Sequence, residues 1–384
     1  MTDLPIDLPY LKLVSRAKHR ILSSYLRPWS EILGGASRRI GVPDRVAYVD
    51  CFAGGGIYSD EDGNPLPGSP LIALKQALDY VAARPGAERI LFFVERDHAT
   101  AERLRALLAA ECPNPPSSVS YHIFERTAQA FVDDLLARVD QTGRRLVPSF
   151  FFVDPYGHPI TVPVMRRILR VPRTEILVNV MWSQINRDLA NPAVQRHVDT
   201  LFGHARWRSE SFTRMAGDAR EDAFLDYFVR EVSAAYHIDF PVGYSPEDRV
   251  RGGLGRTKYY LIHFSSHPKA ARLMKDVMYA QSDVASYLGF AGWAAAASAS
   301  GQMPLFELPG PDLAQLWGRL RHRFASRTVD FEGVILETLS WPFGEKHYRE
   351  VLKERDKTGE VVIDRRKSKR DGLTDGDLIT FPPI

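Results

Sequence analysis

Short, almost uninterrupted apolar runs recur between residues 46 and 180, and stretches whose apolar positions are spaced three and four apart lie between them. The short runs predict buried β-strands, and the spaced stretches predict amphipathic helices. Because strands that alternate with helices form parallel sheets, this part of the chain predicts an α/β fold with a doubly wound, mostly parallel sheet. The expected strands are 46–50, 89–95, 119–124, 149–154 and 175–180, and the expected helices begin at Ser69 or cover 100–110, 128–139 and 162–169.

The pattern is less regular on both sides of this segment. Residues 10–33 have helical spacing, which we expect Gly34 and Gly35 to end. Residues 282–312 are rich in Ala, Ser, Gly and Pro and predict a small-residue helix and linker, so we place a domain boundary near residue 305. Between the strand that ends at residue 180 and this linker, we expect a helix at 221–235 and the last two strands of the sheet at 240–244 and 258–264. The predicted domains are an N-terminal helical segment (1–40), a sheet domain (41–305) and a C-terminal domain (306–384).

The C-terminal domain shows helical patterns followed by two short strands around a basic hairpin, which is the order of a winged helix-turn-helix. Between Arg319 and Arg370 there are 14 Lys and Arg against 9 Asp and Glu. Such an excess is typical of a nucleic-acid footprint, although a solvated helix face or a winged helix used for protein contacts would also explain it. The expected elements are helices at 313–326, 331–339 and 345–354, of which the last would face a groove, and strands at 360–363 and 378–381.

Composition narrows the class of protein. The 384 residues are 45% hydrophobic and 25% charged, which is ordinary for a globular protein of two or three domains. No apolar run approaches the length of a membrane helix and the chain begins without a signal-peptide pattern, so we expect a cytoplasmic protein that does not enter a membrane. Cys51 and Cys112 are too few for a zinc cage, so we expect no structural metal.

The first candidate site follows the strand at 46–50. That strand ends in Asp50 and turns through Gly54 and Gly56, where the lack of a Cβ lets a ligand approach the backbone closely. Only half of a dinucleotide fingerprint is present, and the next helix is delayed until Ser69 by the excursion 57–67. This favours S-adenosylmethionine, which has no pyrophosphate, over NAD(P), which stays an alternative.

A second acid suits the same cofactor. Glu95 ends the next strand, where its carboxylate could accept hydrogen bonds from a ribose diol. The carboxyl ends of neighbouring parallel strands meet at one edge of the sheet. Asp50 and Glu95 are therefore expected to border one cofactor pocket.

The second candidate site is Asp154-Pro155-Tyr156-Gly157, at the end of the strand 149–154. A carboxylate and a backbone carbonyl restrained by Pro could orient an exocyclic amine of a base, and an aromatic ring could stack on the extruded base. The residue types thus suit N-methyl transfer. A plain turn is the alternative, because Asp, Pro and Gly are also common turn residues.

Four segments together resemble the three-Cys-motif partner protein family. They are residues 48–56, 67–73, 151–157 and 342–348, and they span nearly the whole chain. The resemblance implies a methyltransferase-like domain of the Rossmann-like class I kind with a C-terminal winged helix. It also implies association with a radical-enzyme-like protein that carries three cysteines.

The turn at 48–56 and the Pro-Gly-Ser-Pro segment are also similar to those of ribosomal RNA adenine-N6 methyltransferases. By this likeness Phe52, Gly54, Ser69 and Glu95 would line the cofactor pocket, and the turn that begins at Glu125 would lie beside the adenine of the cofactor. The pair Lys18 and His19 resembles a Lys-His pair that reaches the cofactor in that family.

One departure concerns the second site. The adenine-N6 enzymes carry Asp-Pro-Pro-Tyr, whereas here one Pro is missing, and Asp-Pro-Tyr-Gly is closer to the Asp-Pro-Phe-Gly of tRNA guanine-N2 dimethyltransferases. Both families methylate an exocyclic amine. The missing Pro therefore leaves the identity of the acceptor base undetermined, whereas the type of reaction is the same in either case.

The sequence therefore predicts an S-adenosylmethionine-dependent N-methyltransferase acting on DNA or RNA, with adenine N6 favoured and guanine N2 as an alternative. A non-catalytic nucleic-acid- or partner-binding protein is a further alternative. The expected catalytic residues are Asp154, Pro155 and Tyr156. The expected cofactor residues are His19, Asp50, Phe52, Gly54, Gly56, Ser69, Glu95 and Glu125. The expected nucleic-acid residues are Lys346, Arg349, Lys353, Arg365, Arg366, Lys367, Lys369 and Arg370.

Overall fold

The computed structural model describes residues 8–143, 145–155, 160–243, 257–282, 312–365 and 372–384. Its centre is a seven-stranded sheet with the order β5-β4-β1-β6-β7-β9-β8, in which the first five are parallel and β9 runs antiparallel to both neighbours. This confirms the predicted doubly wound, mostly parallel Rossmann-like sheet of the class I methyltransferase kind. The strands are β1 (Arg45–Asp50), β4 (Glu88–Glu95), β5 (Val119–Glu125), β6 (Ser149–Val153), β7 (Thr174–Val180), β8 (Tyr236–Gly243) and β9 (Thr257–Ser265).

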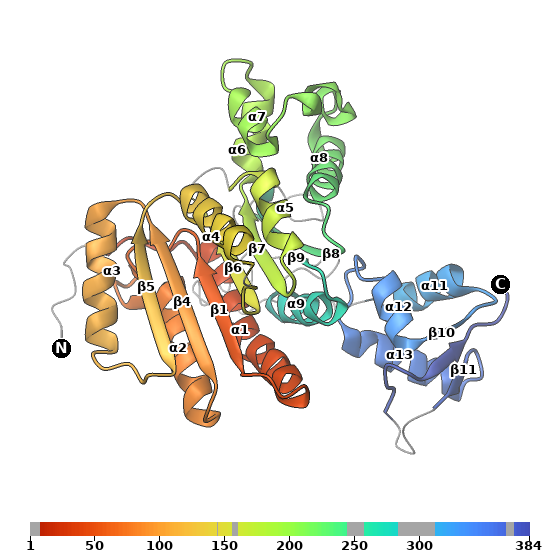
Figure 1. Ribbon diagram of the computed structural model, residues 1–384. Coiled ribbons are helices and arrows are strands. Elements are labelled where there is room, and N and C mark those ends of the chain that lie inside the picture. The colour runs from red at the N-terminus through yellow and green to blue at the C-terminus, as the bar shows by residue number, and fades with distance from the viewer. Residues whose placement is uncertain (1–7, 144, 156–159, 244–256, 283–311, 366–371) are drawn as a thin grey trace.

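Helices cover both faces of this sheet (Figure 1). The central strands are apolar at consecutive positions because alternate side chains enter the two cores. In β6, Phe150 and Phe152 pack under one set of helices, and Phe151 and Val153 pack under the other. The first set is α1 (Leu13–Arg39), α2 (Ser69–Ala83), α3 (His98–Glu111) and α9 (Pro268–Gln281). The second set includes α4 (Ala128–Thr142), α5 (Val162–Arg170) and α8 (Gly217–Val232).

The N-terminal helix α1 corrects the expected stop at Gly34 and Gly35, because it continues to Arg39. Gly34 serves close packing. A Cβ at that position would lie 2.3 Å from both Asp44 Oδ2 and the Tyr80 hydroxyl. The missing side chain therefore lets α1 approach α2, and the helix tolerates the glycine for that reason.

The excursion 57–67 is a small β-hairpin made of β2 (Ile57–Ser59) and β3 (Pro65–Pro67). The Gly68 N–H donates to the Gly56 carbonyl at 2.8 Å and closes the base of this hairpin. The helix α2 then begins at Ser69, as predicted, with Pro in its first turn.

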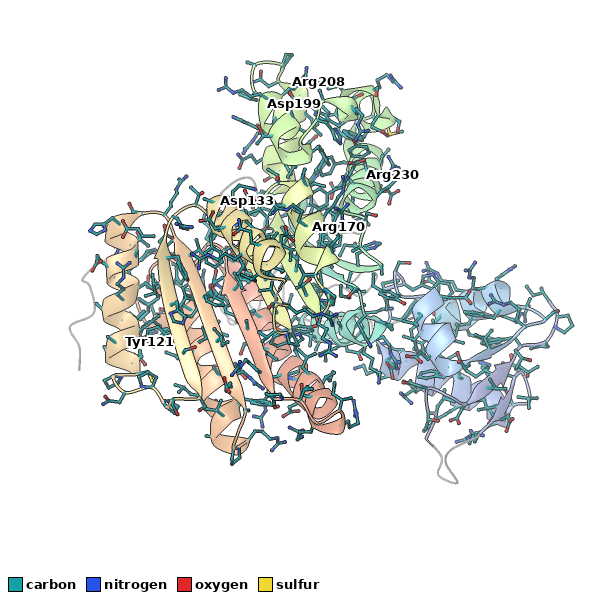
Figure 2. The ribbon with its side chains drawn as sticks, viewed as in Figure 1. Tyr121, Asp133, Arg170, Asp199, Arg208 and Arg230 are labelled. Carbon is teal, nitrogen blue, oxygen red and sulfur yellow. The ribbon has the colours of Figure 1, made fainter. Side chains whose placement is uncertain are left out.

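Beyond β7, the chain forms a projecting helical unit of α6 (Trp182–Ala190), α7 (Arg196–Phe202), η1 (Arg206–Ser209), η2 (Ser211–Arg214) and α8. Asp199 holds the far end of this unit, where Figure 2 labels it beside Arg208. Its carboxylate accepts from Trp207 Nε1 at 2.9 Å and from Arg208 Nη2 at 2.6 Å. The expected helix at 221–235 is α8, which ends at Val232 because Ser233 takes a left-handed conformation.

The C-terminal part has its own core and a three-stranded antiparallel sheet of order β10-β12-β11. Its helices and last two strands are found where the sequence predicts them, and the short β10 is additional. The boundary near 305 lies outside the described residues, and the winged-helix interpretation stays a prediction. The elements are α11 (Leu313–Phe324), β10 (Thr328–Asp330), α12 (Phe331–Glu337), α13 (Glu345–Lys357), β11 (Val362–Asp364) and β12 (Leu378–Thr380).

The helix α9 lies between the central sheet and these C-terminal helices (Figure 1). Arg272 of α9 is largely buried and reaches the carboxylates of Glu345 and Asp375, each at 2.8 Å, and that of Glu332 at 3.5 Å. The buried Lys275 donates to the Thr338 carbonyl at 3.2 Å. The first turn of α13 is therefore fixed against the sheet domain.

None of the helices in the described part of the chain is long and apolar enough to cross a membrane.

Candidate functional site

A cavity of about 1040 Å³ lies at the carboxyl edge of the sheet, beyond the ends of β1, β4 and β6. Open α/β sheets bind their ligands at this edge, where the strand order reverses. The register places the three ends close together, since Asp50 pairs with Phe93 and Phe152, and β4 and β6 end shortly after these partners, at Glu95 and Val153. The predicted residues that line the cavity are His19, Phe52, Gly54, Ser69, Glu95, Asp154 and Pro155.

Asp50 lies beneath the cavity rather than in its lining. It is fully buried, and its carboxylate accepts from the Phe52 N–H at 3.2 Å and from the Tyr48 hydroxyl at 3.1 Å. The Ser69 hydroxyl also hydrogen-bonds to it, and burial raises the pKa of Asp50 to about 7 against the opposing effect of these bonds. Asp50 thus fixes the end of β1 to the start of α2 and positions the turn above it.

The glycines of the turn have distinct roles. Gly54 and Gly56 both have positive φ, 61° and 78°, which favours glycine at each position. Gly54 lines the cavity. Gly56 faces α3, where a Cβ would come within 2.9 Å of Leu104 and Leu107, so its function is close packing.

Glu95 is held by the backbone of its neighbours. Its Oε2 accepts from the Gly54 N–H at 3.1 Å, and its Oε1 accepts from the Asp97 N–H at 2.8 Å. A carboxylate has about four acceptor positions, so both oxygens retain capacity for further donors. Glu95 is therefore a pre-oriented acceptor for a ligand with adjacent hydroxyls.

The side of the cavity formed by α1 carries Lys18 and His19. Burial, followed by the neighbouring Lys18 ammonium, lowers the pKa of His19 to about 4, so its imidazole is neutral at pH 7. Its ring lies 5.7 Å from that of Tyr58, which comes from the β-hairpin and also lines the cavity. Sequence reasoning missed Tyr58, because nothing in the excursion 57–67 indicated that it folds back over the turn.

Asp154 binds two residues that are far from it in sequence. Lys18 Nζ lies 2.5 Å from Oδ2, and Asn179 Nδ2 donates to Oδ1 at 2.8 Å. Sequence reasoning missed Asn179, although a polar residue near the end of the buried strand β7 is a detectable signal. Pro155 lines the cavity, whereas the predicted Tyr156 and Gly157 lie outside the described residues.

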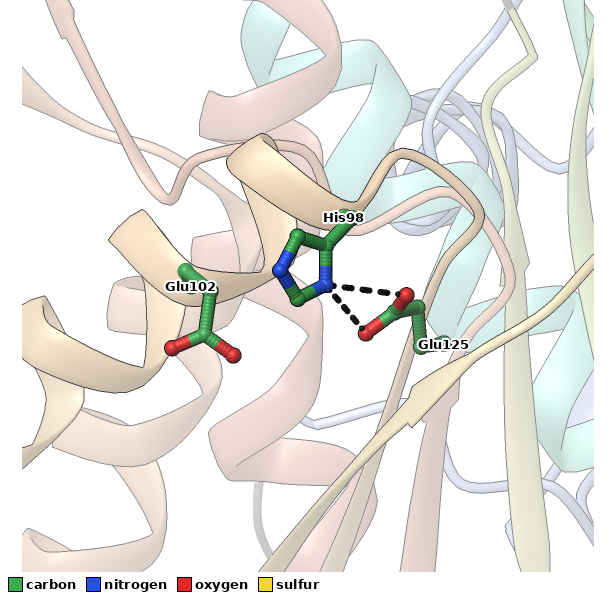
Figure 3. Close-up of side chains that lie close together, drawn as sticks. All are labelled: His98, Glu102 and Glu125. Carbon is green, nitrogen blue, oxygen red and sulfur yellow. Dashed lines mark hydrogen bonds and ion pairs between the residues drawn. The ribbon is translucent and has the colours of Figure 1, made fainter.

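Glu125 lies outside the lining of the cavity. Both of its oxygens are 3.0 Å from His98 Nδ1, and Glu102 is close to them, as Figure 3 shows. Arg105 forms ion pairs with both glutamates, so the cluster already contains its own cation. The neighbouring residues Arg126, Thr127, Ala128 and Gln129 line the cavity in place of Glu125.

The predicted nucleic-acid residues are only partly available. The Arg349 guanidinium bonds to the Leu373 carbonyl and to Glu345, and that of Arg365 bonds to Asp356 at 2.9 Å. Lys346 lies over the Tyr279 ring at 5.6 Å, and Lys353 is half-buried. Arg366, Lys367, Lys369 and Arg370 lie outside the described residues.

Comparison with known proteins adds little beyond this geometry. No family model and no curated protein matches the chain. Among solved structures, it is similar to an SAM-dependent methyltransferase from Agrobacterium tumefaciens, with 10% identity, 62% of this chain and 61% of that chain covered, and a TM-score of 0.30. It is also similar to a protein described as a sarcosine dimethylglycine methyltransferase from Galdieria sulphuraria, with 10% identity, 62% and 86% covered, and a TM-score of 0.23. The chain thus spans about three fifths of the first structure, and the fold assignment rests on the strand order of this sheet.

Proposed function

We propose that this protein is an S-adenosylmethionine-dependent N-methyltransferase that acts on an exocyclic amine of a nucleic-acid base. The observation that carries the proposal is the single cavity into which the ends of β1, β4 and β6 bring Gly54, Glu95 and Asp154. When bound, S-adenosylmethionine supplies a methyl group activated by a sulfonium. The chain's own residues bind that cofactor and orient the amine that accepts the methyl group.

The charges around the turn favour S-adenosylmethionine over NAD(P). A dinucleotide places its pyrophosphate at a helix N-terminus, but here the start of α2 is bonded to the buried carboxyl of Asp50. Glu95 and Asp97 add further acids to the lining. A carboxyl at this helix start disfavours a pyrophosphate there, and Glu95 is placed to accept hydrogen bonds from the ribose hydroxyls of S-adenosylmethionine.

At the other end, Asp154 would orient the acceptor amine. Its oxygens can accept additional hydrogen bonds beyond those from Lys18 and Asn179, and an amine N–H is a suitable donor. Hydrogen bonds from the amine to this carboxylate would direct the nitrogen lone pair toward the methyl group. Adenine N6 is the favoured acceptor, and guanine N2 is the alternative.

The C-terminal part would supply contacts to nucleic acid. Arg319, His322 and Arg323 lie along one face of α11 and border a shallow depression beside Trp341. Cations next to an aromatic ring at the surface suit phosphates and bases. Contacts made by α11 would therefore supplement those of Lys346 and the basic hairpin.

A non-catalytic protein that binds nucleic acid, or a three-cysteine radical-enzyme-like partner, is the second candidate. The ion pair between Lys18 and Asp154 favours it, because it neutralises the carboxylate expected to act on the amine. The two candidates differ in whether methyl transfer depends on Asp154.

Calorimetric titration of the folded chain with S-adenosylmethionine tests the cofactor, and absence of binding overturns the proposal. Transfer of labelled methyl groups to DNA and RNA tests the reaction. We expect Asp154→Ala to reduce transfer by about 100-fold or more while cofactor binding persists. Asp140→Ala, a substitution on α4 outside the cavity lining, is the matched control, and equal transfer by both variants overturns the role of Asp154.

A further inference from the structure

We propose that Asn179 is the second hydrogen-bond acceptor for the amine, so that the site takes a primary exocyclic amine and disfavours it once one methyl group has been added. The inference rests on the proposed function and deepens it, since it names the kind of amine that the same cavity takes. It differs from the expectation drawn from the sequence, in which a backbone carbonyl restrained by Pro155 accepts beside the Asp154 carboxylate.

The pairing of β6 with β7 places Asn179 beside Asp154. The register joins Val153 to Val178, and the residues that follow these two are Asp154 and Asn179. Both line the cavity, and Asn179 Nδ2 donates to Asp154 Oδ1 at 2.8 Å. The amide and the carboxylate therefore form one polar pair at the acceptor end of the cavity.

The contacts of the Asn179 NH₂ group determine which end of this amide is the oxygen. An ionised carboxylate only accepts hydrogen bonds, so the amide nitrogen must face Asp154. The same nitrogen lies 3.7 Å from the Met181 sulfur, a weak acceptor, so both of its protons have partners. The oxygen is therefore the atom of this side chain that is left to bind a ligand.

The Asn179 oxygen is buried and lacks a donor. The residue is 3% exposed, and within the described part of the chain its Oδ1 has no hydrogen-bond partner. Burial without a partner is unfavourable for an amide oxygen, so such an atom usually marks a missing partner. Because the oxygen only accepts, that partner is an N–H or O–H donor, and an exocyclic amine is such a donor.

The spacing of the two acceptors suits the two protons of one NH₂ group. The 2.8 Å hydrogen bond and the width of one amide place Asn179 Oδ1 within about 5 Å of Asp154 Oδ1. A planar NH₂ group that donates two hydrogen bonds of about 2.9 Å likewise holds its acceptors about 5 Å apart. Asp154 keeps acceptor positions beyond those used by Lys18 and Asn179, so one amine can donate to both residues of the polar pair.

Methyl transfer leaves the amine with one N–H in place of two. The amine nitrogen bonds to the methyl carbon, the carbon–sulfur bond breaks with its electron pair going to sulfur, and the nitrogen loses one proton to water. The resulting secondary amine can donate to Asp154 or to Asn179, but not to both. A site built to bind an N–H discriminates against a ligand that lacks it, because a buried polar group is then left without a partner. The site should therefore disfavour a second transfer.

The test compares adenosine with N6-methyladenosine, by equilibrium binding to the full chain in the presence of saturating S-adenosylhomocysteine. We expect adenosine to bind at least about 10-fold more tightly, because only its NH₂ group supplies both protons. Asn179→Leu, which keeps the approximate size of the side chain without its polar atoms, should lower this ratio at least about 5-fold by weakening adenosine alone. If Asn179 only positioned Asp154, both compounds would weaken equally and the ratio would not change.

Asn186→Leu, a substitution on α6 outside the cavity lining, is the matched control and should keep the ratio. Retained affinity for S-adenosylhomocysteine shows that the Asn179 variant is folded, and Asn179→Ala replaces Asn179→Leu in the same comparison if it is not. Guanosine and N2-methylguanosine form a second pair of compounds, because guanine N2 is the alternative acceptor.

Equal affinities within both pairs of compounds, absence of binding of all four, or a ratio that survives the Asn179 variant overturn the inference. In the transfer assay, mass spectrometry of the digested nucleic acid should find the monomethylated base, and accumulation of a dimethylated base also overturns it. Failure of the cofactor to bind would refute the proposed function, whereas the comparison of nucleosides without cofactor would still report on Asn179.

Discussion

At the scale of single residues, the acids at the strand ends differ in the side chains that they contact. Asp50, Glu95 and Asp154 all follow apolar strands, and their positions could be predicted because the strand pattern is local. Their partners could not, since Lys18 and Asn179 meet Asp154 only through the folded sheet. Glu125 also ends a strand, yet it binds His98, because strand position does not determine where a long side chain turns.

Asp50→Asn should reveal the unfavourable burial of this carboxyl. Its pKa is about 7 in the folded chain, above its ordinary value, so the unfolded chain loses that proton at lower pH and stability falls as pH rises from about 4 through 7. Asn has no such titration and can accept from the Phe52 N–H. We expect the variant to be more stable than the unmodified chain by about 1–3 kcal/mol at pH 8, with the advantage lost by about pH 5.

Urea unfolding at the two pH values measures this difference. Asp50→Ala is the control, because it removes the acceptor as well as the charge and should be destabilised at both pH values. A difference between Asp50→Asn and the unmodified chain that does not change with pH would contradict the prediction.

Glu95→Gln should weaken the cofactor site. The Gln amide would present an NH₂ to either the Gly54 or the Asp97 N–H, where the carboxylate now accepts from both. It would also lose one acceptor for a ribose diol. We expect the dissociation constant for S-adenosylmethionine, measured by calorimetry, to rise at least about 10-fold, which corresponds to about 1.4 kcal/mol. Glu102→Gln on the exposed face of α3 should bind normally, and unchanged binding by Glu95→Gln would remove that residue from the site.

At the scale of elements, the buried strands were predictable because a short, continuous apolar run bounded by turn residues is typical of a strand that is buried on both faces. The hairpin β2–β3 was not, since its strands are short and pair around polar residues and Pro. Gly34 was wrongly predicted to end a helix, because the role of this glycine depends on a neighbouring helix that the local sequence does not show. A glycine that permits close contact and a glycine that ends a helix are identical in sequence, and only the neighbouring α2 distinguishes them.

Gly68→Ala should disturb the turn through the base of this hairpin. A Cβ at Gly68 would lie 2.9 Å from the Gly56 carbonyl oxygen, a backbone atom that cannot rotate away. Relief requires the hairpin to move away from α2, which displaces Ser69 from Asp50. We expect a loss of stability of about 1–3 kcal/mol and weaker cofactor binding. Gly318→Ala on α11 meets nothing within 4 Å and should be neutral or slightly stabilising in the same thermal unfolding assay.

At the scale of the whole molecule, the order of helices and strands in the C-terminal part could be predicted from sequence, but its docking could not. The interface is made by single side chains of α9 that meet three separate C-terminal segments. One consequence concerns α13, whose first turns carry Lys346 and Arg349. Because the start of α13 packs on α9, it is less free to enter a groove than an isolated winged helix would be, and α11 is the more accessible basic helix.

Arg272→Met should separate the two parts of the molecule. The Arg272 side chain is 11% exposed and lies among Glu332, Glu345 and Asp375, so its removal takes away the cation that these three carboxylates share and leaves Arg349 paired with Glu345 alone. Loss of one partner of a largely buried ion pair costs about 3–5 kcal/mol, and mutual repulsion of the remaining acids should make the effect larger at pH 7.5 than at pH 5. The sheet core does not depend on this residue, so unfolding of the variant should split into two transitions, with the C-terminal part melting first.

Arg327→Met, which removes an exposed partner of Glu337 within the C-terminal part, should keep a single transition. Differential scanning calorimetry distinguishes the outcomes, and a single transition for Arg272→Met at an unchanged temperature would show that the apolar contacts of α9 hold the two parts together without the ion pairs.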